Sequence, residues 1–303
     1  MADFAPTLIF VPGIRPKPPA EQQQAQLRRC LQSAAAKSGA SEELAVSMAD
    51  NFQLVGWSHQ FYGEHAEISP DVPGIERLLA GQDSRQEDRK QAASLESHFT
   101  ALFYDIGDRF PLLTRMFATR RMETRVAEIH SYFADQAGRA TEARLMVAEA
   151  LQSAWDRGSP VILVGHSFGS VIAWDTLWEL SRLEGNPGNV DLFLTMGSPL
   201  TMQYIRGQLK GARQSRAERY PENISRWINV AAVGEVTALG RKMSNLFGDM
   251  VTLGLTESIS DNLETVNQFH GPFGLNPHKC YGYMASQEVA QILLAEFSRG
   301  AST

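Results

Sequence analysis

A short glycine-flanked segment in the middle of the chain places a serine where it could act as a nucleophile. The segment is Gly165-His166-Ser167-Phe168-Gly169, and it follows the apolar run Val161 to Val164 and precedes a helix-forming stretch. A sharp turn between a strand and a helix projects a serine hydroxyl above the sheet edge, and the glycines relieve crowding around it. The chemistry that this arrangement serves is attack on an acyl carbonyl.

Such a serine needs a base and an acid from elsewhere in the chain. A hydroxyl is a weak nucleophile at neutral pH, and it gains strength from a histidine that takes its proton while a carboxylate orients the imidazole. The chain has seven histidines, and only His270 and His278 follow the serine, as the strand-turn-helix architecture requires. Position alone therefore leaves both as candidates for the base.

Apolar patterns predict the elements that must position these residues. Val161 to Val164 is a continuous apolar run of the kind expected for a parallel strand covered on both faces, and we place it at the centre of the fold. Further strands are predicted at 7–11, 52–57, 191–196 and 227–233, and helices at 20–37, from an N-cap at Thr141 to Gly158, and at 171–183. This order predicts an α/β chain with a doubly wound, mostly parallel sheet.

Residues 60–132 differ from the rest in being charge-rich with helical apolar periods. We predict that they form a helical cap inserted into a core made of residues 1–59 and 133–303. Within this region, five arginines stand between Arg109 and Arg125 against one carboxylate, Glu123, with apolar residues interleaved. An interfacial helix on an anionic membrane, a lid that receives an acyl chain and a solvated cap helix would all show this pattern.

Composition excludes several other classes. The net charge of −6 opposes binding to a phosphate backbone, so no nucleic-acid partner is expected. The only cysteines, Cys30 and Cys280, are too few for a disulfide framework or a zinc finger. Dinucleotide, phosphate-loop and zinc-helix motifs do not occur, so no metal or organic cofactor is predicted. The acidic start and the lack of a long apolar stretch favour a cytoplasmic location.

In the residues around the serine and in their order, the chain resembles the α/β-hydrolase superfamily, in particular bacterial esterase-like or lipase-like serine hydrolases. The resemblance rests on Gly165-His166-Ser167-Phe168-Gly169 with the small-residue helix after it, on the strand and turn from Thr7 to Gly13, on Thr195-Met196-Gly197-Ser198-Pro199, and on His278-Lys279-Cys280-Tyr281. It does not cover the middle insertion. The late His-x-x-Tyr pattern favours His278 over His270 as the base.

The resemblance also implies the remaining members of the site. Members of the superfamily place the acid just after a late core strand, which indicates Glu235, with Asp249 and Asp261 as alternatives. The backbone amides of Phe168 and Ile14 are expected to bind the oxyanion, although this chain has Pro12-Gly13 where many relatives have His-Gly.

The predicted function is therefore cleavage of an ester of a small-molecule acyl substrate by a Ser-His-acid triad. An amidase, a thioesterase or an acyltransferase would use the same groups, and a catalytically silent binding protein on the same fold is the alternative from another class. Substrate, acyl length and oligomeric state do not follow from the sequence.

Overall fold

Six parallel strands form the core of the fold. The computed structural model describes residues 5–81, 85–93, 120–135, 137–235 and 242–300. The strands stand in the order β2-β1-β3-β4-β5-β6, and every neighbouring pair is parallel. Their bounds are β1 Thr7–Val11, β2 Phe52–Leu54, β3 Val161–His166, β4 Val190–Met196, β5 Ile224–Ala232 and β6 Ser258–Thr265.

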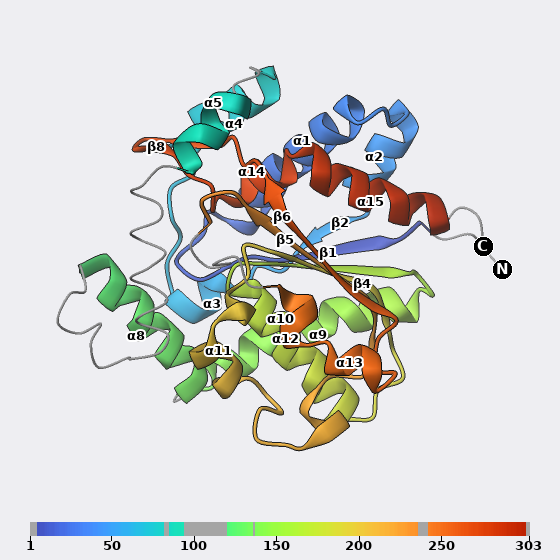
Figure 1. Ribbon diagram of the computed structural model, residues 1–303. Coiled ribbons are helices and arrows are strands. Elements are labelled where there is room, and N and C mark those ends of the chain that lie inside the picture. The colour runs from blue at the N-terminus through green and yellow to red at the C-terminus, as the bar shows by residue number, and fades with distance from the viewer. Residues whose placement is uncertain (1–4, 82–84, 94–119, 136, 236–241, 301–303) are drawn as a thin grey trace.

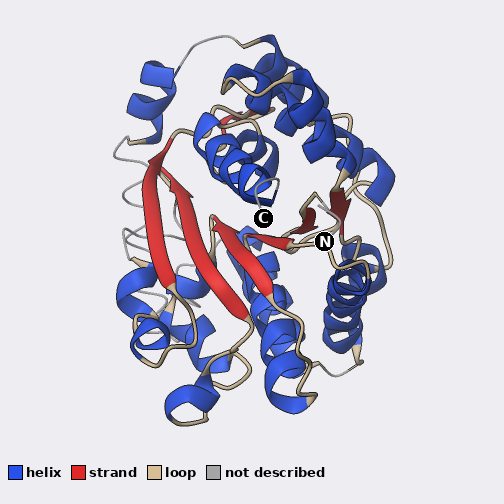
Figure 2. Ribbon diagram, turned by 90° about the vertical axis from the view of Figure 1, so that its right-hand side faces the viewer, coloured by secondary structure: helices blue, strands red, loops and turns tan. Residues whose placement is uncertain are grey.

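Helices cover both faces of the sheet, because parallel neighbours must be joined by crossover connections (Figure 1, Figure 2). One layer holds α1 Ala20–Lys37, α2 Glu42–Asp50, α4 Val72–Ala80, α14 Cys280–Met284 and α15 Gln287–Gly300. The other layer holds α3 Ser58–Tyr62, α8 Arg120–Ala134, α9 Arg139–Asp156, α10 Gly169–Trp178, α11 Gln203–Gln208, α12 Met243–Leu246 and α13 Asp249–Thr252. The shorter elements are α5 Arg85–Ala92, the π-helical turn η1 Glu179–Leu183, the 3-10 turns η2 Pro199–Thr201 and η3 Arg216–Arg219, and the antiparallel pair β7 His270–Gly271 and β8 Gly274–Leu275.

The central strand divides its side chains between two hydrophobic clusters. Val161 and Leu163 belong to the cluster under α9 and α10, whereas Ile162 and Val164 belong to the cluster under α1 and α15. Successive side chains of a strand point to opposite faces, so a strand covered by helices on both sides must be apolar throughout. This is why the strand appears in the sequence as an unbroken apolar run.

The order in which the chain adds strands changes direction between β1 and β3. It moves outward from β1 to β2 and then returns to β3 on the other side of β1. The carboxyl ends of β1 and β3 therefore flank a topological switch point, which is where open α/β sheets bind their ligands. The segments that leave these ends are residues 12–15 and residues 167–168.

The predicted α/β architecture with a mostly parallel sheet flanked by helices is confirmed. The first strand and the first helix have the predicted bounds, whereas β2 ends at Leu54 and not at Trp57. Of the predicted insertion, α4, α5 and α8 lie largely or wholly within residues 60–132, while residues 94–119 lie outside the described residues and so do the side chains at 120–126. The predicted membrane-contacting segment, 109–125, falls in that part. No helix in the described ranges is long and apolar enough to cross a membrane.

Candidate active site

Ser167 stands in the turn between β3 and α10 with a backbone conformation that is unusual for its residue type. Its φ is +53°, in the left-handed region, where a side chain costs about 1–3 kcal/mol and is kept only if the surroundings enforce it. Two glycines allow the turn to close. A Cβ on Gly165 would come within 2.6 Å of Ser170 Cα, and a Cβ on Gly169 within 2.0 Å of the carbonyl oxygen of Val11. The turn therefore packs directly against the end of β1 and presents a partly exposed hydroxyl.

His278 lies between Ser167 and Glu235. Its Nε2 is 2.8 Å from Ser167 Oγ, and its Nδ1 is 2.8 Å from Glu235 Oε2. A carboxylate can only accept a hydrogen bond, so Nδ1 carries the proton that points to Glu235 and Nε2 is left to accept the proton of the serine hydroxyl. The structure thus brings the three predicted residues into one continuous chain of hydrogen bonds, from segments 111 and 43 residues apart.

The carboxylate of Glu235 is enclosed, with its side chain 2% exposed. Glu235 follows β5 in a turn in which its amide donates to the carbonyl of Ala232. The hydroxyl of Tyr283, from α14, donates to Glu235 Oε2 at 3.2 Å and accepts a 2.8 Å hydrogen bond from the amide of Ala232. Burial and the charge of Glu235 raise the pKa of Tyr283 well above 10, so the hydroxyl remains a donor. Sequence reasoning missed Tyr283, and only its place five residues after His278 could have indicated it.

Gly197 lies against the contact between the histidine and the acid. Its φ is +55°, and a Cβ there would stand 3.0 Å from Glu235 Oε2 and 3.1 Å from His278 Nδ1. Gly197 follows β4, and its amide donates to the carbonyl of Val230 on β5. A side chain at position 197 would therefore be strained by the backbone angle and would press on the contact between His278 and Glu235.

The segment after β1 approaches the serine from the other side. A Cβ on Gly13 would stand 2.7 Å from Ser167 Cβ. The carbonyl of Pro12 accepts a 2.8 Å hydrogen bond from Trp57 Nε1, which anchors the start of the segment. Ile14, whose amide is the predicted second oxyanion donor, directly follows Gly13 in this segment.

The peptide unit between Ile14 and Arg15 is fixed at both ends. Lys17 Nζ donates to the carbonyl of Ile14 at 2.7 Å, and the amide of Arg15 donates to Tyr62 Oη at 2.8 Å. Arg15 has a φ of +80°, a strained value for a residue with a side chain. Burial lowers the pKa of Lys17 to about 8. These contacts explain how a strained segment keeps one conformation.

Phe168, the residue after the serine, is the N-cap of α10, so its amide lies where a helix leaves N–H groups without intrahelical acceptors. Within the described residues, no hydrogen bond engages the amide of Phe168 or that of Ile14. The ring of Phe168 packs edge-on against Tyr132 and Phe133 of α8, with centroids 5.0 and 5.9 Å apart.

The alternative residues from the sequence have hydrogen-bond partners other than Ser167 and His278. His270 Nε2 is 2.8 Å from Asp88 Oδ1, and Asp249 faces the hydroxyl of Tyr220 at 3.4 Å. Asp261 lies on β6, where its carboxylate accepts from the side chain of Asn229 and from the amides at positions 243 and 244. Cys280 is buried, and burial raises the pKa of its thiol, which opposes thiolate chemistry.

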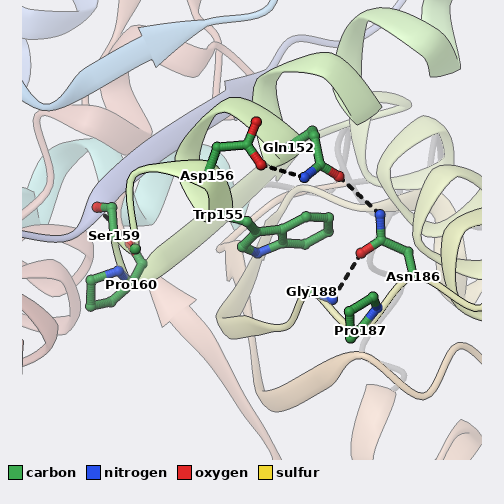
Figure 3. Close-up of a pocket in the computed structure, with 9 residues that line it drawn as sticks. Gln152, Trp155, Asp156, Ser159, Pro160, Asn186, Pro187 and Gly188 are labelled. Atoms are coloured by element: carbon green, nitrogen blue, oxygen red, sulfur yellow. Dashed lines mark hydrogen bonds between the residues drawn. The ribbon is translucent and has the colours of Figure 1, made fainter.

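A separate depression of about 490 Å³ lies at the amino end of the sheet. It is bounded by the end of α9 and by the segments that enter β3 and β4 (Figure 3). Its polar groups form hydrogen bonds with one another, between Gln152 and Asp156 and between Asn186 and both Gln152 and Gly188. Because Ser167 lies beyond the carboxyl end of β3, this depression is not part of the site. Among the described residues, no cluster of three or more His, Cys, Asp or Glu could hold a metal ion.

This arrangement allows one chemical step without further groups. The hydroxyl of Ser167 can pass its proton to the imidazole of His278, which the buried carboxylate of Glu235 orients. Comparisons of the chain with family models, with curated proteins and with solved structures found no match.

Proposed function

We propose that this chain is a serine hydrolase that transfers the acyl group of an ester to water, and that it belongs to the α/β-hydrolase superfamily. The observation that carries the proposal is the pair of 2.8 Å hydrogen bonds that join Ser167 to His278 and His278 to Glu235. The parallel sheet, with the serine next to its switch point, supports the assignment.

In the proposed reaction, Ser167 Oγ forms a bond to the carbonyl carbon of the ester while its proton passes to His278 Nε2. Glu235 stabilises the imidazolium that results, and the amides of Phe168 and Ile14 donate to the oxyanion. Collapse of the tetrahedral intermediate breaks the bond to the leaving alcohol, which takes the proton from Nε2. Water then attacks the acyl-enzyme by the same route, which releases the carboxylic acid and restores the serine.

An ester substrate is proposed because the resemblance is to esterase-like and lipase-like hydrolases, and the leaving alcohol would take the proton that His278 holds. Amide, thioester or alcohol-acceptor chemistry would use the same three residues, so these remain alternatives within the enzyme class. The hydrogen bonds of His278 with Ser167 and with Glu235 are the reason to favour a hydrolase over a silent binding protein, because a binding protein does not need them.

Labelling with a fluorophosphonate tests the proposal without assuming a substrate. The intact mass of the wild type should rise by one adduct, and the adduct should be absent from Ser167→Ala and His278→Ala. His270→Ala is the matched control, because His270 also contacts a carboxylate but does not reach the serine, and it should be labelled like the wild type. Hydrolysis of p-nitrophenyl esters of increasing acyl length would follow. A folded wild type that takes no label would overturn the proposal.

A further inference from the structure

His166, the residue before the serine, points to the opposite face of the sheet from the α9 and α10 layer. It follows Ile162 and Val164 in the alternation of β3, and those residues belong to the cluster under α1 and α15. The same cluster contains Tyr283, on the helix that begins two residues after His278. The alternation of side chains along β3 thus places the imidazole of His166 beside the segment that carries the proposed base, His278.

His166 contacts the main chain of His278. Its Nε2 is 2.8 Å from the carbonyl oxygen of His278, and because a carbonyl only accepts, Nε2 carries the hydrogen. Burial, followed by the charge on His278, holds the pKa of His166 well below its usual range, so the ring is neutral. A neutral ring beside His278 avoids a second positive charge when His278 takes up the serine proton.

The ring of His166 has little freedom to move. It is 6% exposed, stacks on Phe10 with an interplanar angle of 14°, and packs against the rings of Tyr283 and His278 at 5.9 and 5.1 Å. The other charged groups that face it are Lys17, after β1, and Glu235, after β5. An imidazole held in this way is a rigid donor.

We propose that His166 is a positioning residue, whose hydrogen bond to the carbonyl of His278 fixes the backbone from which the imidazole of His278 reaches both Ser167 and Glu235. Its effect on rate rests on the proposed function, whereas its effect on the geometry of His278 does not. Asn276 and Asn267 hold the same segment through the amide of His278 and the carbonyl of Lys279, and His166 adds the contact that comes from the strand before the serine.

Two substitutions separate the donor from the ring. His166→Phe keeps an aromatic ring against Phe10 but loses the N–H, and His166→Gln loses the ring but keeps an N–H donor. The probe is the fluorophosphonate, with its reaction resolved into an affinity constant and a maximal rate. Because a displacement of about 1 Å costs about 100-fold in rate, we expect His166→Phe to lower the maximal rate about 10- to 100-fold at unchanged affinity, and His166→Gln to stay within about 5-fold of the wild type. His270→Gln, on a histidine outside the site, should react like the wild type.

A second readout does not depend on reactivity. The Nδ1–H proton of His278, hydrogen-bonded to Glu235, should give a downfield NMR signal in the wild type and in His166→Gln that is lost in His166→Phe. Equal rates and an unchanged signal in His166→Phe would overturn the positioning role, and so would an equal loss in both variants that follows their loss of thermal stability. If the wild type takes no label but its signal still depends on the donor at position 166, the hydrolase proposal fails and the positioning of His278 stands.

Discussion

Tyr132 and Asp175 form a buried hydrogen bond, 3.0 Å long, between α8 and α10. The second oxygen of Asp175 accepts a 2.8 Å hydrogen bond from the amide of Lys210. The ring of Tyr132 also packs on Phe168, the residue after the serine. Tyr132 of α8 therefore contacts both Asp175 in α10 and Phe168, whose amide we propose as an oxyanion donor. A displacement of α8 would therefore move Phe168.

The carboxyl group of Asp175 should make stability depend on pH. Burial raises its pKa from 3.8 to about 7. The contribution of Asp175 to the free energy of unfolding is fully present below pH 3.8, where both the folded and the unfolded chain hold the proton. It is lost as the pH rises to about 7, because the carboxyl group ionises in the unfolded chain first. We expect Asp175→Asn to remove this loss, so that its free energy of unfolding rises relative to the wild type by a few kcal/mol, on the order of 1.4 kcal/mol per unit of pKa, between pH 4 and 8.

Denaturant unfolding at several pH values would measure this difference. Asp50→Asn, at an exposed carboxylate on the end of α2, is the control and should give a curve parallel to that of the wild type. A difference between Asp175→Asn and the wild type that is the same at pH 4 and pH 8 would contradict the prediction.

Tyr283 and Tyr281 give a second pair of matched variants on one helix. Tyr283→Phe removes the donor to Glu235 and the acceptor of the amide of Ala232, so we expect a loss of about 2–3 kcal/mol in the free energy of unfolding and slower labelling of Ser167. The hydroxyl of Tyr281 is buried without a hydrogen-bond partner in the described part of the chain, so Tyr281→Phe should be neutral or stabilising. Urea unfolding and labelling rates of the two variants would check this, and equal losses would show that any buried hydroxyl here has the same effect.

The central elements could be predicted because their signals are local. The apolar run of β3 and the glycines around Ser167 define a strand and a turn without reference to distant residues, and Glu235 was indicated by its place just after a strand. Position alone left His270 and His278 open, and the choice of His278 came from the resemblance, through the His-x-x-Tyr pattern that His278 begins. The catalytic roles stay predictions.

Long-range contacts account for what the sequence missed. Thr141 was predicted as an N-cap, but α9 begins at Arg139, because Asp135, across a turn, accepts from the amides of Ala140 and Thr141. The N-cap prediction was wrong because the carboxylate that accepts from these amides stands five and six residues earlier in the chain, and a rule about the N-cap residue alone does not consider it. The contact of Trp57 with the carbonyl of Pro12 and that of Tyr283 with Glu235 join segments 45 and 48 residues apart, and no spacing rule predicts such pairs.

Gly197 should be intolerant of a side chain for two separable reasons. Its φ of +55° alone costs a side chain about 1–2 kcal/mol, and a Cβ would also press on Glu235 and His278. Gly185 isolates the first reason, because its φ is +62° and no atom lies within 4 Å of its Cβ position. Both Gly→Ala variants should lose similar stability from the backbone, but only Gly197→Ala should also lose fluorophosphonate labelling. Full labelling of a folded Gly197→Ala would show that the contact of His278 with Glu235 tolerates displacement.

Lys17 should affect the rate through the segment that carries the second oxyanion donor. Its ammonium group holds the carbonyl of Ile14, and with it the orientation of a peptide unit next to a strained Arg15. Lys17→Met keeps the length of the side chain but releases that carbonyl. Because complete loss of an oxyanion donor costs about 100- to 1,000-fold, a donor that is only loosened should lower the labelling rate by about 10-fold. Lys37→Met is the control, since Lys37 Nζ also donates to a backbone carbonyl, that of Leu78, but on the α1 side of the molecule. If the two variants react at the same rate, the hydrogen bond from Lys17 does not hold the oxyanion segment in place.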